Sequence, residues 1–153
     1  MEEILLKVIV QQISELEEDK VIIQCHELSD TIQQIKEYLQ SIDTFIVGIE
    51  GDKKVKIPFH DIYYVESVDN RTFAYLNKRV IILEIKLYQF EEISKNKGFI
   101  RISKSVVLNL HTVEKARSAL NGRILLELDN GEKVMVTRHY VPELRKSLQG
   151  EMK

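Results

Sequence analysis

Short β-rich runs separated by tight-turn residues are the feature that most constrains the fold of this chain. Between residues 45 and 137, runs of four to eight residues with strand-like composition follow one another closely, and Asn-Gly pairs separate the last three. Asn-Gly suits a tight hairpin because both residues tolerate a positive φ angle, which matches the natural twist of paired strands. The pattern predicts strands over residues 45–50, 54–59, 62–68, 72–77, 79–85, 99–102, 105–110, 113–120, 123–128 and 133–137.

Three short helices are predicted beside these strands. The first begins at Ser29 or Asp30, because either side chain can accept the free backbone N–H groups of a first helical turn. The second covers residues 87–97 and ends at Gly98, a favoured residue after a helix C-terminus. The third covers residues 142–148. The expected fold class is therefore mainly β with short helices (α+β).

The N-terminal 43 residues are predicted to form a separate strand-strand-helix unit. Residues 4–13 and 21–25 are rich in β-branched side chains and short enough to be strands. Two strands and a helix make a marginal fold, so we expect residues 1–43 to pack on the rest of the chain or on a second copy. Cys25 is expected to be buried in this unit. Residues 44–148 are expected to form the β domain.

The charges divide between the same two parts of the chain. Residues 1–43 carry three basic and ten acidic side chains, whereas residues 44–147 carry 18 basic and 13 acidic ones. A basic domain joined to an acidic segment suggests that the domain meets an anionic polymer and that the segment stays in solvent or meets a protein. Two ordinary solvated surfaces are the alternative.

Composition also indicates the compartment and argues against catalysis. No apolar run approaches the roughly 20 residues needed to cross a bilayer, the first residues lack a basic signal start, and Cys25 is the only cysteine. We therefore expect a cytoplasmic protein. The histidines are scattered without metal-ligand spacing, so no enzyme, metal, cofactor or small-molecule substrate is predicted. They are His26, His60, His111 and His139.

The segment from Phe99 to Tyr140 holds the side chains best suited to DNA. Arg138 and Asn109 have forked donors and acceptors that match the major-groove edges of guanine and adenine. Lys104 and Ser105 suit phosphate contacts. The alternatives are a solvated arginine at Arg138 and a turn-forming asparagine at Asn109.

Several segments, in this order, resemble the LytTR family of bacterial DNA-binding domains. The most specific are Phe99-x-Arg101-x-x-Lys104-Ser105 with the following Asn109, and Thr137-Arg138-x-Tyr140 after an Asn-Gly hairpin. The resemblance covers residues 44–148 and implies an elongated fold of stacked, mostly antiparallel sheets that presents loops to DNA. It also runs through IPFHDIYYVES (57–67), FIRISKSVVLNL (99–110), NGRILLELDNGEKVMVTR (121–138) and YVPELRKSL (140–148).

The resemblance assigns DNA contacts to particular residues. Arg138 occupies the place of the family's base-reading arginine, and Lys104 and Ser105 match its basic and hydroxyl pair. Arg71 lies in the first reading loop, where other members often carry a histidine or a longer insert, so a phosphate contact and a plain exposed position are both open. The full set is Asn70, Arg71, Arg101, Lys104, Ser105, Asn109, Arg138 and Tyr140.

The function implied is that of a short transcriptional regulator without a receiver domain. We expect it to bind repeats in promoter double-stranded DNA as a homodimer, with residues 1–43 forming the dimer contact or a regulatory surface. Short members of the family are commonly restrained by a small membrane protein, which the resemblance implies as a partner. The alternative is a protein-interaction module that uses the same scaffold to control a regulatory partner. RNA binding fits less well, because the aromatic residues fall at strand positions that look internal.

Overall fold

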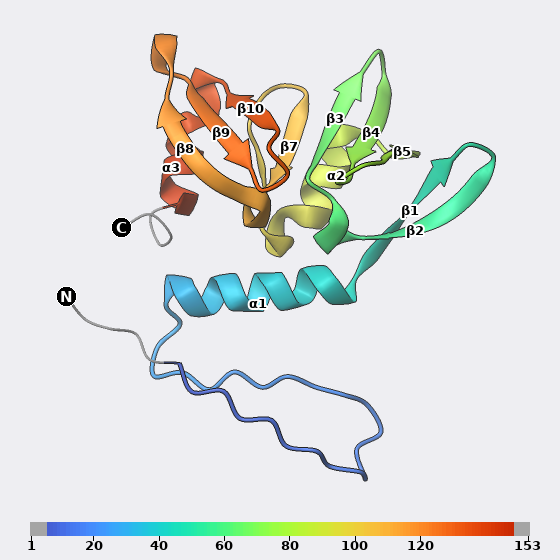
Figure 1. Cartoon of the computed structure of the whole chain (residues 1–153), viewed down its shortest axis with the longest axis vertical. Coiled ribbons are helices and arrows are strands. Elements are labelled where there is room, and N and C mark those ends of the chain that lie inside the picture. The colour runs from blue at the N-terminus through green and yellow to red at the C-terminus, as the bar shows by residue number, and fades with distance from the viewer. Residues whose placement is uncertain (1–5, 149–153) are drawn as a thin grey trace.

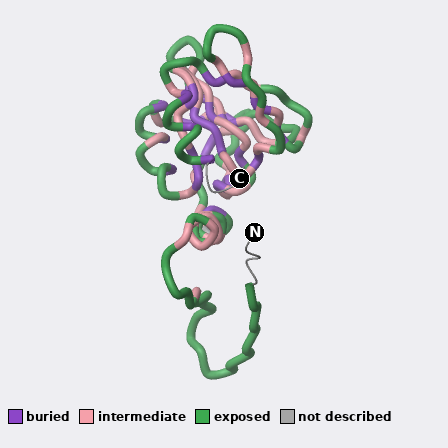
Figure 2. The backbone as a smooth tube through the Cα atoms, turned by 90° about the vertical axis from the view of Figure 1, so that its left-hand side faces the viewer, coloured by how far each residue is buried: buried purple, intermediate pink, exposed green. Residues whose placement is uncertain are grey.

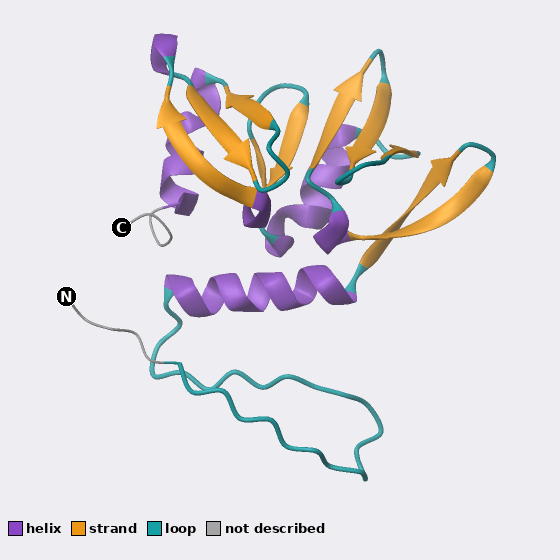
Figure 3. Cartoon of the chain, viewed as in Figure 1, coloured by secondary structure: helices purple, strands orange, loops and turns teal. Residues whose placement is uncertain are grey.

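The structure, a computed structural model, describes residues 6–148, with the side chain of residue 43 excepted. The strands are β1 (Phe45–Glu50), β2 (Lys53–Pro58), β3 (Tyr64–Val68), β4 (Arg71–Tyr75), β5 (Val80–Leu83), β6 (Phe99–Arg101), β7 (Val106–Asn109), β8 (Val113–Ser118), β9 (Ile124–Leu128) and β10 (Lys133–Val136). The helices are α1 (Asp30–Asp43), α2 (Leu87–Ser94) and α3 (Val141–Leu148), and the short 3-10 turns are η1 (Phe59–Asp61), η2 (Lys95–Lys97), η3 (Leu110–Thr112), η4 (Leu120–Gly122) and η5 (Arg138–Tyr140). The predicted mainly β fold with short helices is confirmed (Figure 3).

The strands form two antiparallel sheets that stand side by side (Figure 1). The larger sheet has the strand order β2-β1-β5-β4-β3-β7-β6, and the smaller has the order β10-β9-β8. Each strand predicted between residues 45 and 137 is present to within two residues at either end. No helix within residues 6–148 has both the length and the apolar content needed to cross a bilayer.

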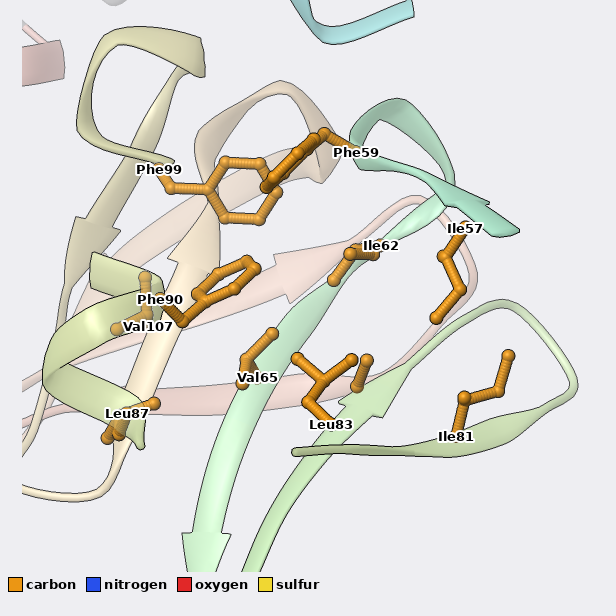
Figure 4. Packing of buried hydrophobic residues seen from close by; sticks show 11 residues of the cluster. Ile57, Phe59, Ile62, Val65, Ile81, Leu83, Leu87, Phe90, Phe99 and Val107 are labelled. Carbon is orange, nitrogen blue, oxygen red and sulfur yellow. The ribbon is translucent and has the colours of Figure 1, made fainter. Parts of the chain in front are cut away.

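Two hydrophobic clusters hold these elements together. In the first, Phe90 of α2 is fully buried, with its ring 5.8 Å from that of Phe59 and 5.3 Å from that of Phe99 (Figure 4). The second cluster joins the two sheets, because it combines Leu108 of β7 with Leu126 of β9 and residues of α3. The domain is therefore rigid enough to fix the loops at its ends.

Helix α1 begins where the sequence predicts. The backbone N–H of Ile32 donates to the Ser29 side chain at 3.2 Å, which caps the first turn. The helix lies across one end of the domain (Figure 1). There the Tyr38 ring contacts the rings of His60 and His111 edge-on at 5.0 and 5.6 Å, and Ser41 is buried.

The two N-terminal strands are not formed. Residues 6–28, here called the arm, project beyond α1 as an extended, exposed segment (Figure 2), and residues 4 and 5 lie outside the described residues. The predicted strand over residues 21–25 is also absent. A strand needs backbone hydrogen bonds to a neighbouring strand, and among the described residues neither run makes them to the other run or to the sheets. Cys25 is exposed, so its predicted burial is also wrong.

Candidate nucleic-acid interface

Four connections lie together at the end of the domain farthest from α1 (Figure 1). They are the β3–β4 turn, the β6–β7 loop, η4 and the junction of β10 with η5, and we call residues 69–71, 103–105, 120–122 and 137–138 the loop edge. Backbone hydrogen bonds link its parts: Ser67 N–H donates to Ser105 C=O at 2.8 Å, and Thr137 N–H donates to Ile102 C=O at 3.0 Å. The loop edge is therefore one connected surface that draws on both sheets.

The β6–β7 loop is shaped by Arg101. Its guanidinium Nε donates to Ser103 C=O at 2.7 Å, another nitrogen donates to Lys104 C=O, and a third pairs with Glu91 of α2 at 2.9 Å. Arg101 is thus engaged inside the protein, and the geometry favours a loop-positioning role for it over the predicted DNA contact. Lys104 stands exposed at the tip of this loop, beside half-buried Ser105.

The β3–β4 turn presents Asn70 and Arg71. Asp69 and Asn70 have φ angles of 50° and 63°, the two left-handed residues that a tight two-residue hairpin requires. Arg71 follows as the first residue of β4, and both Asn70 and Arg71 are exposed. The predicted turn is confirmed, and its two polar side chains lie on the loop edge.

Arg138 rests on the turn between β8 and β9. It is exposed as the first residue of η5, and its aliphatic stem lies so close to Gly122 that a Cβ on that glycine would be 2.8 Å from Arg138 Cδ. Gly122 also has a φ of +74°. The sequence predicts Gly122 only as a turn residue. Its second role, contact with the side chain of Arg138, is not predicted.

We expect Gly122→Ala to misplace Arg138. The matched control is Gly131→Ala, because Gly131 has a similar φ of +88° but nothing within 4 Å of its position for a Cβ. Both changes should destabilise the fold by about 1 kcal/mol through backbone strain. Only Gly122→Ala should also weaken DNA binding, by on the order of 1 kcal/mol, in a fluorescence anisotropy titration. Equal DNA affinities for the two variants would contradict this role of Gly122.

Asn109 does not lie on the loop edge. It is 1% exposed, its side-chain amide donates to Ile62 C=O at 2.9 Å, and its side-chain oxygen accepts from His111 N–H at 3.0 Å. These bonds join β7 to the segment before β3 and cap η3. The geometry therefore favours a structural role for Asn109 over the predicted base contact.

Tyr140 also has a packing role. It is half-buried, packs against the second hydrophobic cluster, and its ring lies 4.9 Å from that of the exposed His139. It follows Arg138 at the end of η5, so it helps to fix the backbone from which Arg138 projects.

The opposite end of the domain carries charges of both signs. Asp61 and Asp129 line a hollow there together with Tyr38 of α1, and the exposed cations Lys78 and Arg79 line it as well. The Tyr63 hydroxyl donates to Asp129 at 2.5 Å, and this bond raises the pKa of Tyr63 to about 12. Burial lowers the pKa of His111 below its usual value, and neighbouring His60 lowers it further. Packing groups and charges of both signs thus gather around α1. The exposed side chains of the loop edge include the cations Arg71, Lys104 and Arg138 and one carboxylate, Asp69.

Comparison with known protein families agrees with this geometry. The model of the LytTr DNA-binding domain matches residues 52–149, which is most of the chain. The chain belongs to the LytTR family. A solved LytTr DNA-binding domain, from a Bacillus cereus protein described as a methyl-accepting/DNA response regulator, superposes with a TM-score of 0.65 at 26% identity. The superposition covers 69% of this chain and 96% of that domain. The predicted resemblance is confirmed.

Curated relatives of this LytTR chain are bacterial regulators. Transcriptional regulatory protein YpdB of Escherichia coli K12 is 26% identical over 98 residues, which cover 63% of this chain and 40% of YpdB. An uncharacterized HTH-type transcriptional regulator of Staphylococcus aureus is 25% identical over 133 residues, which cover 86% of this chain and 90% of that protein. The chain thus spans about two fifths of the length of YpdB and matches most of the staphylococcal protein.

Proposed function

We propose that this chain is a cytoplasmic transcriptional regulator that reads promoter DNA through the loop edge. The observation that carries the proposal is the gathering of exposed Arg71, Lys104 and Arg138 on one edge of a LytTR domain. These residues come from three separate connections, so the edge offers several contacts spaced along a duplex. The acidic stretch over residues 6–43 lies at the other end, where it does not repel the phosphates (Figure 1).

The residues have different roles in this proposal. Arg138 reads a base, because its planar guanidinium can donate to O6 and N7 of one guanine together. Lys104 and Ser105 bind phosphate and fix the register of the domain on the duplex. Asn70 and Arg71 contact the DNA beside them. Arg101, Asn109 and Tyr140 hold these residues in place.

Lys104→Ala tests the phosphate contact. The variant should lose affinity similarly on promoter and random DNA, and the slope of log affinity against log salt should fall by about 1. The control is Lys146→Ala, because exposed Lys146 shares a surface hollow with Gln33 of α1 and lies off the loop edge. An unchanged salt slope for Lys104→Ala, or an equal change in the control, would rule out a phosphate contact at Lys104.

Assembly and regulation complete the proposal. The chain binds promoter repeats as a homodimer and is restrained by a small membrane protein, whose gene is expected beside that of the regulator. Co-purification with the product of the adjacent reading frame tests this partner. The absence of a receiver domain stays a prediction from the sequence.

A protein-interaction module on the same scaffold is the second candidate function. Its binding would depend little on salt, whereas DNA binding should weaken steeply as salt rises. The exposed cations of the loop edge favour DNA.

A further inference from the structure

Helix α1 has an apolar stripe that it does not use to contact the domain. Tyr38 and Ser41 make the contact, since Tyr38 meets His60 and His111 and Ser41 is buried. At 3.6 residues per turn, the apolar residues of α1 lie about a third of a turn around the helix from these two. They are Ile32, Ile35 and Leu39, which are half-buried, and Ile42, which is 46% exposed, and none of them belongs to either hydrophobic cluster.

The arm extends this unused apolar surface. Val8, Ile9 and Val10 are 84%, 68% and 84% exposed, and Val21 and Ile22 are 68% and 71% exposed. An extended segment of β-branched residues with free backbone groups is a template for strand pairing. Among the described residues, the backbone bonds made by the arm are Leu16 N–H to Ile13 C=O and Ser29 N–H to Glu27 C=O.

We propose that the outer stripe of α1 and the two apolar runs of the arm form the interface with a second copy of this chain. This inference rests on the homodimer in the proposed function and gives it a surface. A second copy supplies what each arm lacks, a strand of the same length with apolar side chains and free backbone groups. Because the surface lies at the α1 end, dimerisation leaves both loop edges uncovered (Figure 1).

The charge pattern of the arm fits self-association. In antiparallel pairing centred on Ile9, Val8 stands opposite Val10 of the second copy, and Lys7 stands opposite Gln11, so no like charges meet. The acidic residues of the arm lie outside the two runs, at Glu15 and residues 17–19 in the bend between them and at Glu27 after the second. The runs themselves therefore call for an apolar partner strand and not for a basic protein.

Sedimentation equilibrium of the full chain tests this interface, with Ile9→Asp in the arm and Ile35→Glu on the stripe. We expect a wild-type dimer and, for each variant, a dimer dissociation constant raised by at least about tenfold. Tyr88→Asp is the control, because Tyr88 is 67% exposed on α2, outside the proposed surface. Ile9 makes no buried contact, so Ile9→Asp cannot fail merely by unfolding the domain.

Binding to DNA with a single half-site separates this proposal from the DNA-reading one. All three variants should keep wild-type affinity for that DNA, since the loop edge is unaltered. A chain that stays monomeric at every concentration, or a dimer as tight in both variants as in the wild type, would overturn the proposal. If only Ile9→Asp weakens the dimer, the α1 stripe is not part of the interface. If only Ile35→Glu weakens it, the arm is not part of the interface.

Discussion

Arg138→Ala is expected to raise the dissociation constant for promoter DNA by about 5- to 150-fold, the equivalent of about 1 to 3 kcal/mol. The affinity should fall for promoter DNA and much less for random DNA, because a bidentate base contact contributes little to binding of random sequences. Discrimination should be lost mainly at one base pair of the site. The side chain is exposed and its stem is supported by Gly122, so its removal disturbs no core packing.

Competition binding with a set of singly substituted promoter fragments measures this effect. Arg145→Ala is the matched control, since Arg145 is an exposed arginine on α3, away from the loop edge. If Arg138→Ala weakens all fragments equally, Arg138 contacts phosphate and not a base. If it weakens none, the proposed reading role is wrong.

Asn109→Ala should act on the fold and not on recognition. The substitution leaves the buried Ile62 C=O and the half-buried His111 N–H without their partner, at a cost of about 2 to 4 kcal/mol in the free energy of unfolding. For a chain of this size the melting temperature should fall by about 5 to 15 °C. Asn77→Ala, at an exposed position in the β4–β5 connection, should change stability by less than about 0.5 kcal/mol.

Calorimetry and DNA binding together decide the role of Asn109. Well below its melting temperature, Asn109→Ala should keep the wild-type base preference and salt slope. A variant with normal melting but altered base preference would show that Asn109 reaches DNA and that its buried position is not the one that acts in recognition.

The elements that the sequence predicts well are those that local chemistry decides. Asp69 and Asn70 form a tight turn because of their own backbone preferences, and Ser29 caps α1 through a bond to a residue three positions away. The arm shows the limit, since residues 6–13 have strand-like composition but find no neighbouring strand within one copy.

In the candidate site, too, some residues can be predicted from local sequence and others depend on distant parts of the chain. Exposed Lys104 and Arg138 can be recognised from their motif, because neither side chain is hydrogen-bonded or ion-paired to another of residues 6–148. Whether a polar side chain points inward depends on distant partners: the amide of Asn109 bonds to a residue 47 positions earlier. The contact of Gly122 with Arg138 likewise requires β9 and β10 to pair.

Nuclear magnetic resonance can show whether DNA lies on the loop edge. Isotope-labelled full-length chain would be titrated with promoter DNA, and the shift of each backbone amide recorded. We expect large shifts in residues 69–71, 103–105, 120–122 and 137–138, while the resonances of α1 and the β9–β10 turn stay near their positions in the free protein. Large shifts confined to α1 and that turn, with an unperturbed loop edge, would contradict this placement of the DNA.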